Sequence, residues 1–335
     1  MINFRKIINE HFLLLSKKKL GLIIPLLIVL LVVSLVLFRE FNKKAPDTET
    51  ANDFSETGCK IGFITDLHAS YSKSSTETIR NESRIPLLQF INAMNDDFHP
   101  DIVVQGGDLI DGREKETEIA RSVFSISIDH FKKLKSPVLH MMGNHETRDG
   151  GVPKELWLKE TGNNETYYYR DCKNTRLIIL DGIEDFQNQY YALSSKQIDW
   201  LNETLDSSES KKVIVFTHVP LITRSEISPR LKSEKEFSSQ QAENIKRLFA
   251  EKGVDIIISG HNEILYRKNE NDVIHQVLPG VFKSKDEEVS WLHSYYEITQ
   301  KDDDISIKML YKKNPEEIKY QTLEIPSPEF DRIEK

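Results

Sequence analysis

Residues 102–111 read IVVQGGDLID, and this stretch decides the class of the fold. Ile102–Gln105 is a short apolar run without alternation, which is typical of a strand that is buried on both faces. Two glycines follow it, and the carboxylates of Asp108 and Asp111 stand just beyond the end of this strand. In open α/β sheets, functional side chains collect where strands end and loops begin. The stretch therefore predicts a buried strand that carries carboxylates to a functional site.

The same pattern of a short apolar run bounded by turn residues recurs along the chain. It predicts further core strands at Lys60–Thr65, Val138–Met142, Leu177–Leu180, Val213–Thr217 and Ile256–Ser259. Helical spacing of apolar residues marks Ile85–Asn95 and Glu116–Leu134, and capping-box patterns begin at Ser194 and Ser238. After His261 the sequence becomes rich in strand-like runs. Together these patterns predict an α/β core that is closed by additional strands.

Four other predicted strand ends carry side chains that suit a divalent cation. They are Asp66-Leu67-His68, Gly143-Asn144-His145-Glu146, His218 and Gly260-His261-Asn262-Glu263. Asp and Asn offer hard oxygen ligands, and His offers a borderline nitrogen. A lone Asp or His at a strand end is more often structural. Packing does not explain why five of the six predicted core strands end in this way.

In chain order, the motifs D-x-H, G-D-x-x-D, G-N-H-E, a single His and G-H-x-E resemble the signature of the calcineurin-like metallophosphoesterases. The resemblance covers the chain from about Lys60 to Leu310. It implies an α/β fold of four layers, in which two mixed β-sheets pack face to face and helices flank them. It also implies a pair of divalent metal ions that are bridged by one Asp.

The resemblance further implies which side chains bind the metals. Asp108 is the bridging ligand, the first metal is also bound by Asp66 and His68, and the second is also bound by Asn144, His218 and His261. Glu263 stands where the family usually has a second His that binds the first metal. A carboxylate there makes the site harder, which favours Mn²⁺ or Fe²⁺, with Mg²⁺ or Zn²⁺ as alternatives. The other interpretation is that Glu263 points away and leaves a weak first site.

The implied activity is that of a metal-dependent phosphoric ester hydrolase. Two cations lower the pKa of a bridging water, so that hydroxide attacks the phosphorus of a phosphate mono- or diester. His145 is implied to contact the phosphate and act as general acid, and Asp111 to orient His145 or hold the neighbouring loop. The sequence does not choose among monoesters, diesters, nucleotide pyrophosphates and lipid head groups. The alternative is a catalytically weak, membrane-tethered binding protein with a degraded first metal site.

The N-terminal part of the chain predicts a membrane anchor. Leu20–Phe38 is a run of 19 uncharged residues, and as a helix it would span about 28 Å, close to the roughly 30 Å of the hydrocarbon core. A cleaved signal peptide is the alternative, but its apolar region is usually shorter and is followed by small residues. Five basic residues precede the run and three follow it. This bias predicts a single-pass protein of the cell membrane with its N-terminus inside and its catalytic domain extracytoplasmic.

The remaining features complete the predicted organisation. Residues 1–19 form a short basic segment, residues 20–38 the anchor, residues 39–58 a flexible linker and residues 59–335 the phosphoesterase domain. Cys59 and Cys172 are the only cysteines, and whether they form a disulfide depends on the compartment and on their separation in the fold. A net charge of −8 without a basic block beyond the N-terminus excludes a protein that coats nucleic acid. The sequence does not indicate an oligomeric state.

Overall fold

The fold is taken from a computed structural model, which describes residues 58–72, 75–112, 117–147, 151–187, 190–209, 211–227, 236–282 and 291–326. The predicted basic segment and anchor, and all of the predicted linker except its last residue, lie outside the described residues. Within the described ranges, no helix combines the length and the apolar character that a membrane crossing requires.

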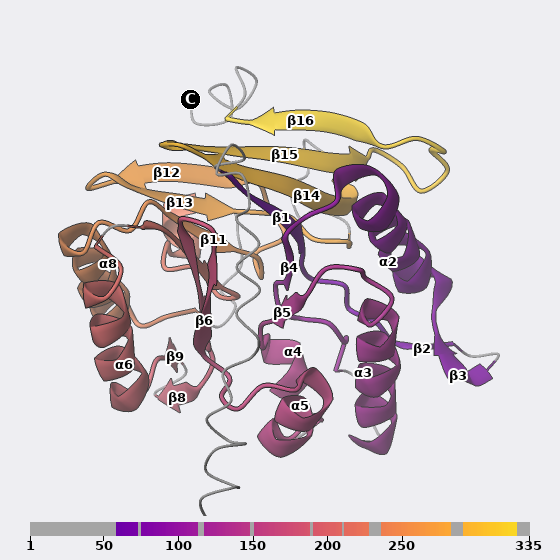
Figure 1. Cartoon of the computed structure of the whole chain (residues 1–335). Helices are drawn as coiled ribbons and strands as arrows, with labels where there is room; N and C mark the ends of the chain where they lie inside the picture. Colours follow the sequence, from indigo (N-terminus) through magenta and orange to yellow (C-terminus); the bar gives the residue numbers. More distant parts are fainter. Residues whose placement is uncertain are drawn as a thin grey trace, which may run out of the picture. The chain divides into compact units, whose positions relative to one another are not determined.

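Two six-stranded sheets form the centre of the fold (Figure 1). The first has the order β16-β15-β14-β1-β4-β5 and consists of β1 (Gly58–Ile64), β4 (Ile102–Gln105), β5 (Val138–His140), β14 (Leu292–Lys301), β15 (Asp304–Lys312) and β16 (Gln321–Ile325). The second has the order β12-β13-β11-β10-β7-β6 and consists of β6 (Tyr168–Cys172), β7 (Thr175–Leu180), β10 (Lys212–Thr217), β11 (Ile256–Ser259), β12 (Tyr266–Glu270) and β13 (Val273–Val277). Each sheet contains both parallel and antiparallel pairs, so the prediction of mixed sheets is confirmed.

The two sheets pack face to face, and their inner surfaces form one apolar core. The ring of Phe63 on β1 stacks against that of Phe216 on β10, with 5.7 Å between the ring centroids. Ile61 and Val104 from the first sheet share this core with Ile258 from the second. Because side chains on the other face of these strands are buried as well, their sequences show continuous apolar runs and no alternation.

Helices cover the outer faces of the sheets (Figure 1). The long helices are α2 (Asn81–Ala93) and α3 (Thr117–Phe131) beside the first sheet, and α6 (Ser195–Asp206) and α8 (Ser239–Glu251) beside the second. Ser194 accepts a hydrogen bond from the Gln197 amide at 3.2 Å, and Ser238 accepts one from the Gln241 amide at 3.3 Å. Both predicted caps are therefore present, and each fixes the start of a helix. The four-layer architecture is confirmed.

The short elements connect these layers. They are the hairpin strands β2 (Tyr71–Ser72), β3 (Ser75–Ile79), β8 (Asp185–Gln187) and β9 (Tyr190–Ala192), the helices α4 (Asn144–Thr147), α5 (Lys154–Thr161) and α7 (Arg224–Ile227), and the π-helix η1 (Met94–Phe98). The helix α4 begins shortly after β5, at the predicted metal ligand Asn144. A ligand at this position is therefore held at the junction of a buried strand and a helix.

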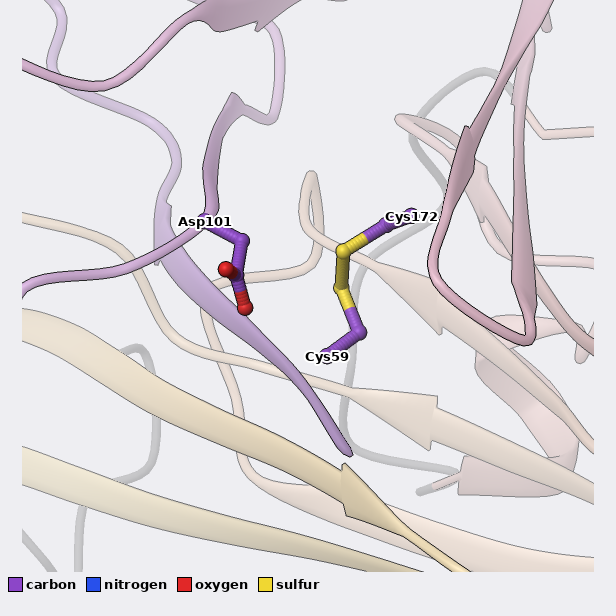
Figure 2. Close-up of side chains that lie close together, drawn as sticks. All are labelled: Cys59, Asp101 and Cys172. Atoms are coloured by element: carbon purple, nitrogen blue, oxygen red, sulfur yellow. A yellow bond between two sulfur atoms is a disulfide. The ribbon is translucent and has the colours of Figure 1, made fainter. Parts of the chain in front are cut away.

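A disulfide joins the two sheets covalently (Figure 2). Cys59 lies on β1 and Cys172 on β6, and their Cα atoms are 5.8 Å apart. Asp101 lies beside them and accepts a hydrogen bond from the Lys60 amide at 2.8 Å. Its carboxylate also pairs with the Lys173 ammonium at 3.1 Å. Because both sulfur atoms are bonded to each other, this cluster is a structural cross-link and offers no thiolate for a metal.

Replacing both cysteines in a Cys59→Ala/Cys172→Ala variant is expected to lower the free energy of unfolding by about 3 to 4 kcal/mol. The disulfide spans a sequence separation of 113 residues, and a cross-link that closes a long loop removes much entropy from the unfolded chain. Urea denaturation of the variant measures the loss, and wild-type protein under reducing conditions should show the same loss. A decrease below about 1 kcal/mol would mean that the cross-link adds little to the packing of the two sheets.

Candidate metal centre

Loops that follow strands of both sheets meet at one end of the core. The Asp66 amide donates to the Gly107 carbonyl at 3.1 Å, which ties the loop after β1 to the loop after β4. The His145 amide donates to Oδ1 of Asp108 at 2.9 Å, and the His261 amide lies 3.2 Å from Oδ1 of Asp66. These bonds join the loops after β1, β4, β5 and β11 into one structure. The predicted convergence of the strand ends is therefore observed.

Six of the seven predicted metal ligands fall into two compact groups. Asp66, His68 and Glu263 each offer a ligand atom within 4.8 Å of the others. Asp108, His218 and His261 form the second group under the same limit. Glu263 thus lies with the residues of the first group, and its Oε1 atom is 3.4 Å from Nε2 of His68. The carboxylate points into the centre and not away from it.

Asp108 belongs to the second group and also faces the first. Its Oδ2 atom is 3.8 Å from Nε2 of His68 in the first group and 3.1 Å from Nε2 of His218 in the second. The side chain is only 2% exposed. A carboxylate in this position can present oxygen to ions on both sides, which is the geometry that a bridging ligand needs.

Two buried side-chain atoms test whether a metal fits the second group. Nδ1 of His218 lies 2.8 Å from the Gly106 carbonyl, so the ring proton belongs on Nδ1 and the lone pair of Nε2 faces the centre. Oδ1 of Asn144 is buried and has no hydrogen-bond partner among the described residues, and Nε2 of His218 faces only the Asp108 carboxylate, 3.1 Å away. Buried polar atoms are normally satisfied. A buried amide oxygen without a partner, and a histidine nitrogen that faces a carboxylate, are both atoms that a divalent cation could satisfy.

The charges of the centre also favour a cation. Burial disfavours the charged form of His218, but the carboxylate of Asp108 outweighs this effect and raises the pKa of His218 to about 9. Burial opposes ionisation of Asp108 in turn, and the charge of His218 outweighs it and holds the pKa of Asp108 well below its usual value. A divalent ion that binds here replaces the proton as the partner of the carboxylate. Metal binding should therefore release protons.

The backbone is strained at the ligands. Five predicted ligands have positive φ although none is glycine, with values of 50° at Asp66, 45° at His68, 48° at Asp108, 64° at His261 and 52° at Glu263. Such conformations are uncommon for non-glycine residues and persist only where the surrounding structure enforces them. Five of the eleven non-glycine residues with positive φ in the described part of the chain therefore lie at this one centre.

Gly143 allows the loops to approach each other closely. A Cβ atom at this position would lie 2.1 Å from the amide nitrogen of Asp108 and 2.3 Å from its Oδ1 atom. Non-bonded atoms do not approach each other so closely, so a side chain at this position would push the Asp108 loop away. The glycine of the G-N-H-E motif therefore lets the Asp108 carboxylate lie against the loop after β5.

His145 stands beside the two groups and is 13% exposed. Its Nδ1 atom contacts the backbone carbonyl of Asp111, and its Nε2 atom is 3.9 Å from Oδ2 of Asp108. The ring also meets that of His68 edge to face, with 4.5 Å between the centroids. Asp111 thus contacts His145 through its main chain, and its carboxylate lies 3.8 Å from the same ring nitrogen.

Glu146 was not among the predicted ligands, and its side chain lies against the turn that carries Asp108. Its buried side chain accepts hydrogen bonds from the amides of Asp108 at 3.1 Å, Leu109 at 2.5 Å and Gly143 at 2.7 Å. Burial, together with the charge of Asp108, raises the pKa of Glu146 to about 7. The residue therefore fixes the turn that carries Asp108. An acidic side chain directly after G-N-H was the available signal.

Comparison with a protein-family model identifies the motif-bearing part of the chain. The model described as calcineurin-like phosphoesterase matches residues 59–262, which is more than half of the sequence. The match begins at the first strand of the core and extends past His261. It therefore includes all of the predicted ligands except Glu263, which lies one residue beyond it.

Individual proteins agree with this match. The human manganese-dependent ADP-ribose/CDP-alcohol diphosphatase is 26% identical over 240 residues, which cover 52% of this chain and 70% of the human protein. The enzyme of the same name from Mus musculus is 26% identical over 234 residues, covering 50% of this chain and 68% of the mouse protein. A dimetal phosphatase from Danio rerio has the same fold, with a TM-score of 0.57 and 16% identity over 80% of this chain and 98% of that structure.

Proposed function

The chain belongs to the calcineurin-like phosphoesterase family and is a metal-dependent phosphoric ester hydrolase, and from this premise we propose that it cleaves phosphate mono- or diesters at the centre described above. Its cofactors are divalent metal ions. In this proposal one ion is held by Asp66, His68, Asp108 and Glu263, and the other by Asp108, Asn144, His218 and His261. The single observation that carries it is the position of Asp108, which belongs to the second ligand group and also faces the first.

The bound ions would supply an activated water and positive charge that offsets the charge developing on the phosphoryl group. The protein's own part is to position them and to handle the proton of the leaving group. The positive φ values at five ligands support such positioning, because conformations of this kind persist only where the surrounding structure enforces them.

His145 is proposed as the general acid. Its Nδ1–H donates to the Asp111 carbonyl, which fixes the plane of the ring. In the imidazolium form Nε2 carries a second proton on the side of the ring that is nearer to Asp108. This proton can pass to the oxygen of the leaving alcohol, which then departs as a neutral molecule. Asp111 acts as a positioning residue for this ring.

Glu263→Gln is expected to weaken Mn²⁺ binding at the first site by at least about tenfold, because the amide removes a negative charge and leaves one carbonyl oxygen as ligand. Calorimetric titration with MnCl₂ measures both sites at once. The second site, which Glu263 does not join, should keep its affinity.

Glu316→Gln is a matched control, since Glu316 is exposed and far along the chain from the ligand motifs. An unchanged two-site titration in Glu263→Gln would remove this carboxylate from the ligand set. Such a result would also favour the alternative in which Glu263 is not a ligand and the first site binds its metal weakly.

We also propose that residues 20–38 anchor the catalytic domain on the extracytoplasmic side of the cell membrane. The apolar run supports the anchor. The Cys59–Cys172 disulfide supports the compartment, because disulfides persist mainly where the surroundings are oxidising. Protease added to intact cells tests the orientation: it should digest the phosphoesterase domain, whereas protection until the membrane is opened would contradict the proposal.

The activity is tested with the purified full chain and Mn²⁺. Bis-p-nitrophenyl phosphate and p-nitrophenyl phosphate report diester and monoester cleavage, and the metal content is measured on the same sample. Two bound metals with turnover support the enzyme. Absence of both bound metal and turnover would instead support a membrane-tethered binding protein that has kept the fold.

A further inference from the structure

A cavity of about 410 Å³ lies next to the metal centre, between the start of α2, residues 281–282, the start of β14 and the end of β15. Its apolar wall consists of Ile85, Val281, Phe282, Leu292 and Pro315. The volume falls in the range of about 300–1,000 Å³ that is usual for small-molecule sites. The cavity is therefore large enough to hold part of a substrate.

The cavity and the metal centre share a wall. The ring of Phe282 meets the ring of His68 edge to face, with 5.2 Å between the centroids. The residues before Phe282 are fixed on the end of β1, because the Val281 amide donates to the Thr65 carbonyl at 3.2 Å. A Cβ atom on Gly280 would lie 2.4 Å from that of Asp66. Residues 280–282 thus contact Asp66 and His68 of the first metal group on one side. On the other side, Val281 and Phe282 line the cavity.

Large apolar side chains are exposed at this cavity. The described residues include five large apolar side chains that are exposed. Two of these line the cavity: Ile85, which is 45% exposed, and Phe282, which is 41% exposed. Apolar surface left open to water beside a reactive centre indicates a binding site for an apolar group. Both side chains would be covered by a ligand that extends from the metals.

The polar side chains of the lining are mostly engaged with the protein. Nζ of Lys312 lies 3.4 Å from Oε1 of Gln89 and 4.9 Å from the centroid of the Tyr320 ring. Oδ1 of Asn81 accepts a hydrogen bond from Arg84 at 2.6 Å. Nδ1 of His293 is buried and has no hydrogen-bond partner within the described part of the chain. The remaining polar side chain of the lining is Glu82, which is exposed and acidic. Four polar residues thus share the lining with the five apolar residues named above, and a hydrocarbon group would contact the apolar ones.

We propose that this cavity binds a hydrocarbon chain of the substrate, so that the enzyme selects phosphate esters that carry an alkyl or alkenyl group. The inference rests on the proposed phosphoesterase function, because the metals must hold the phosphoryl group while Phe282 directs the chain into the cavity. A domain anchored at a membrane would meet esters of this kind.

Alkylphosphonates test the inference without requiring turnover. Methyl, propyl and pentyl phosphonate are titrated calorimetrically into the full chain with Mn²⁺, and p-nitrophenyl esters of the same three phosphonic acids are assayed for hydrolysis. Each buried methylene is expected to tighten binding by up to about fourfold. We expect pentyl phosphonate to bind at least about tenfold more tightly than methyl phosphonate.

Ile85→Gln places a polar group of similar size in the cavity wall and is expected to reduce this gain to less than about threefold. Ile318→Gln is the matched control, because Ile318 is 92% exposed and does not line the cavity; it should keep the full gain. Equal affinity for all three phosphonates, or an equal gain in Ile85→Gln, would overturn the inference. Absence of ester hydrolysis with the chain-length gain intact would contradict the proposed function instead.

Discussion

Asp108→Asn is expected to lose both metal ions and to lower kcat/KM by at least about 10³-fold, since the metals supply several kcal/mol of transition-state stabilisation. The substitution replaces one carboxylate oxygen by an NH₂ group, which donates hydrogen bonds and cannot ligate a cation. Oδ2 of Asp108 lies between His68 and His218. The amide therefore removes charge and a ligand atom at the one position that both groups share.

Metal analysis and kinetics on the same purified protein measure this prediction. Asp303→Asn is the matched control, because Asp303 is 96% exposed and should leave metal content and activity unchanged. Circular dichroism shows whether the variant is folded. If Asp108→Asn kept two metals and lost less than about tenfold in activity, Asp108 could not be the bridging ligand.

The site was predictable to the extent that its chemistry is local in sequence. Each predicted ligand lies within four residues of the end of a buried strand, so the apolar runs located the strands and the residues just after them supplied the ligands. The orientation of Glu263 was not predictable in this way, because the sequence left open whether its side chain points into the metal centre or away from it. The answer depends on the turn at His261 and Glu263, where both residues adopt positive φ, and no sequence pattern predicts that conformation for non-glycine residues.

Features that depend on contacts between distant residues were not predictable. The Cys59–Cys172 pair requires β6 to lie at the edge of the second sheet, opposite β1. The sequence of β6 gave a weak signal, because three of its five residues are exposed. The cavity beside Phe282 combines residues from four separated segments. Such a site forms only after the sheets have packed, so no local motif contains it.

His145→Asn is expected to keep both metals and to lower kcat by about 10²- to 10⁴-fold. The main-chain amide of residue 145, which donates to Oδ1 of Asp108, is unaffected by the substitution. The bridging carboxylate therefore keeps its orientation, and only the ring is lost. Asparagine has no titratable proton to give to a leaving group.

The leaving group separates a general acid from a merely structural histidine. An ester of a simple alcohol needs protonation, whereas p-nitrophenolate leaves as an anion, so His145→Asn should affect the alcohol ester far more. His99→Asn is the matched control, because His99 is exposed and has a φ of 50°, a conformation that asparagine tolerates well. Equal losses for the two esters would leave His145 as a phosphate contact only. Equal metal content and equal activity in His145→Asn and Asp108→Asn would contradict the assigned roles of both residues.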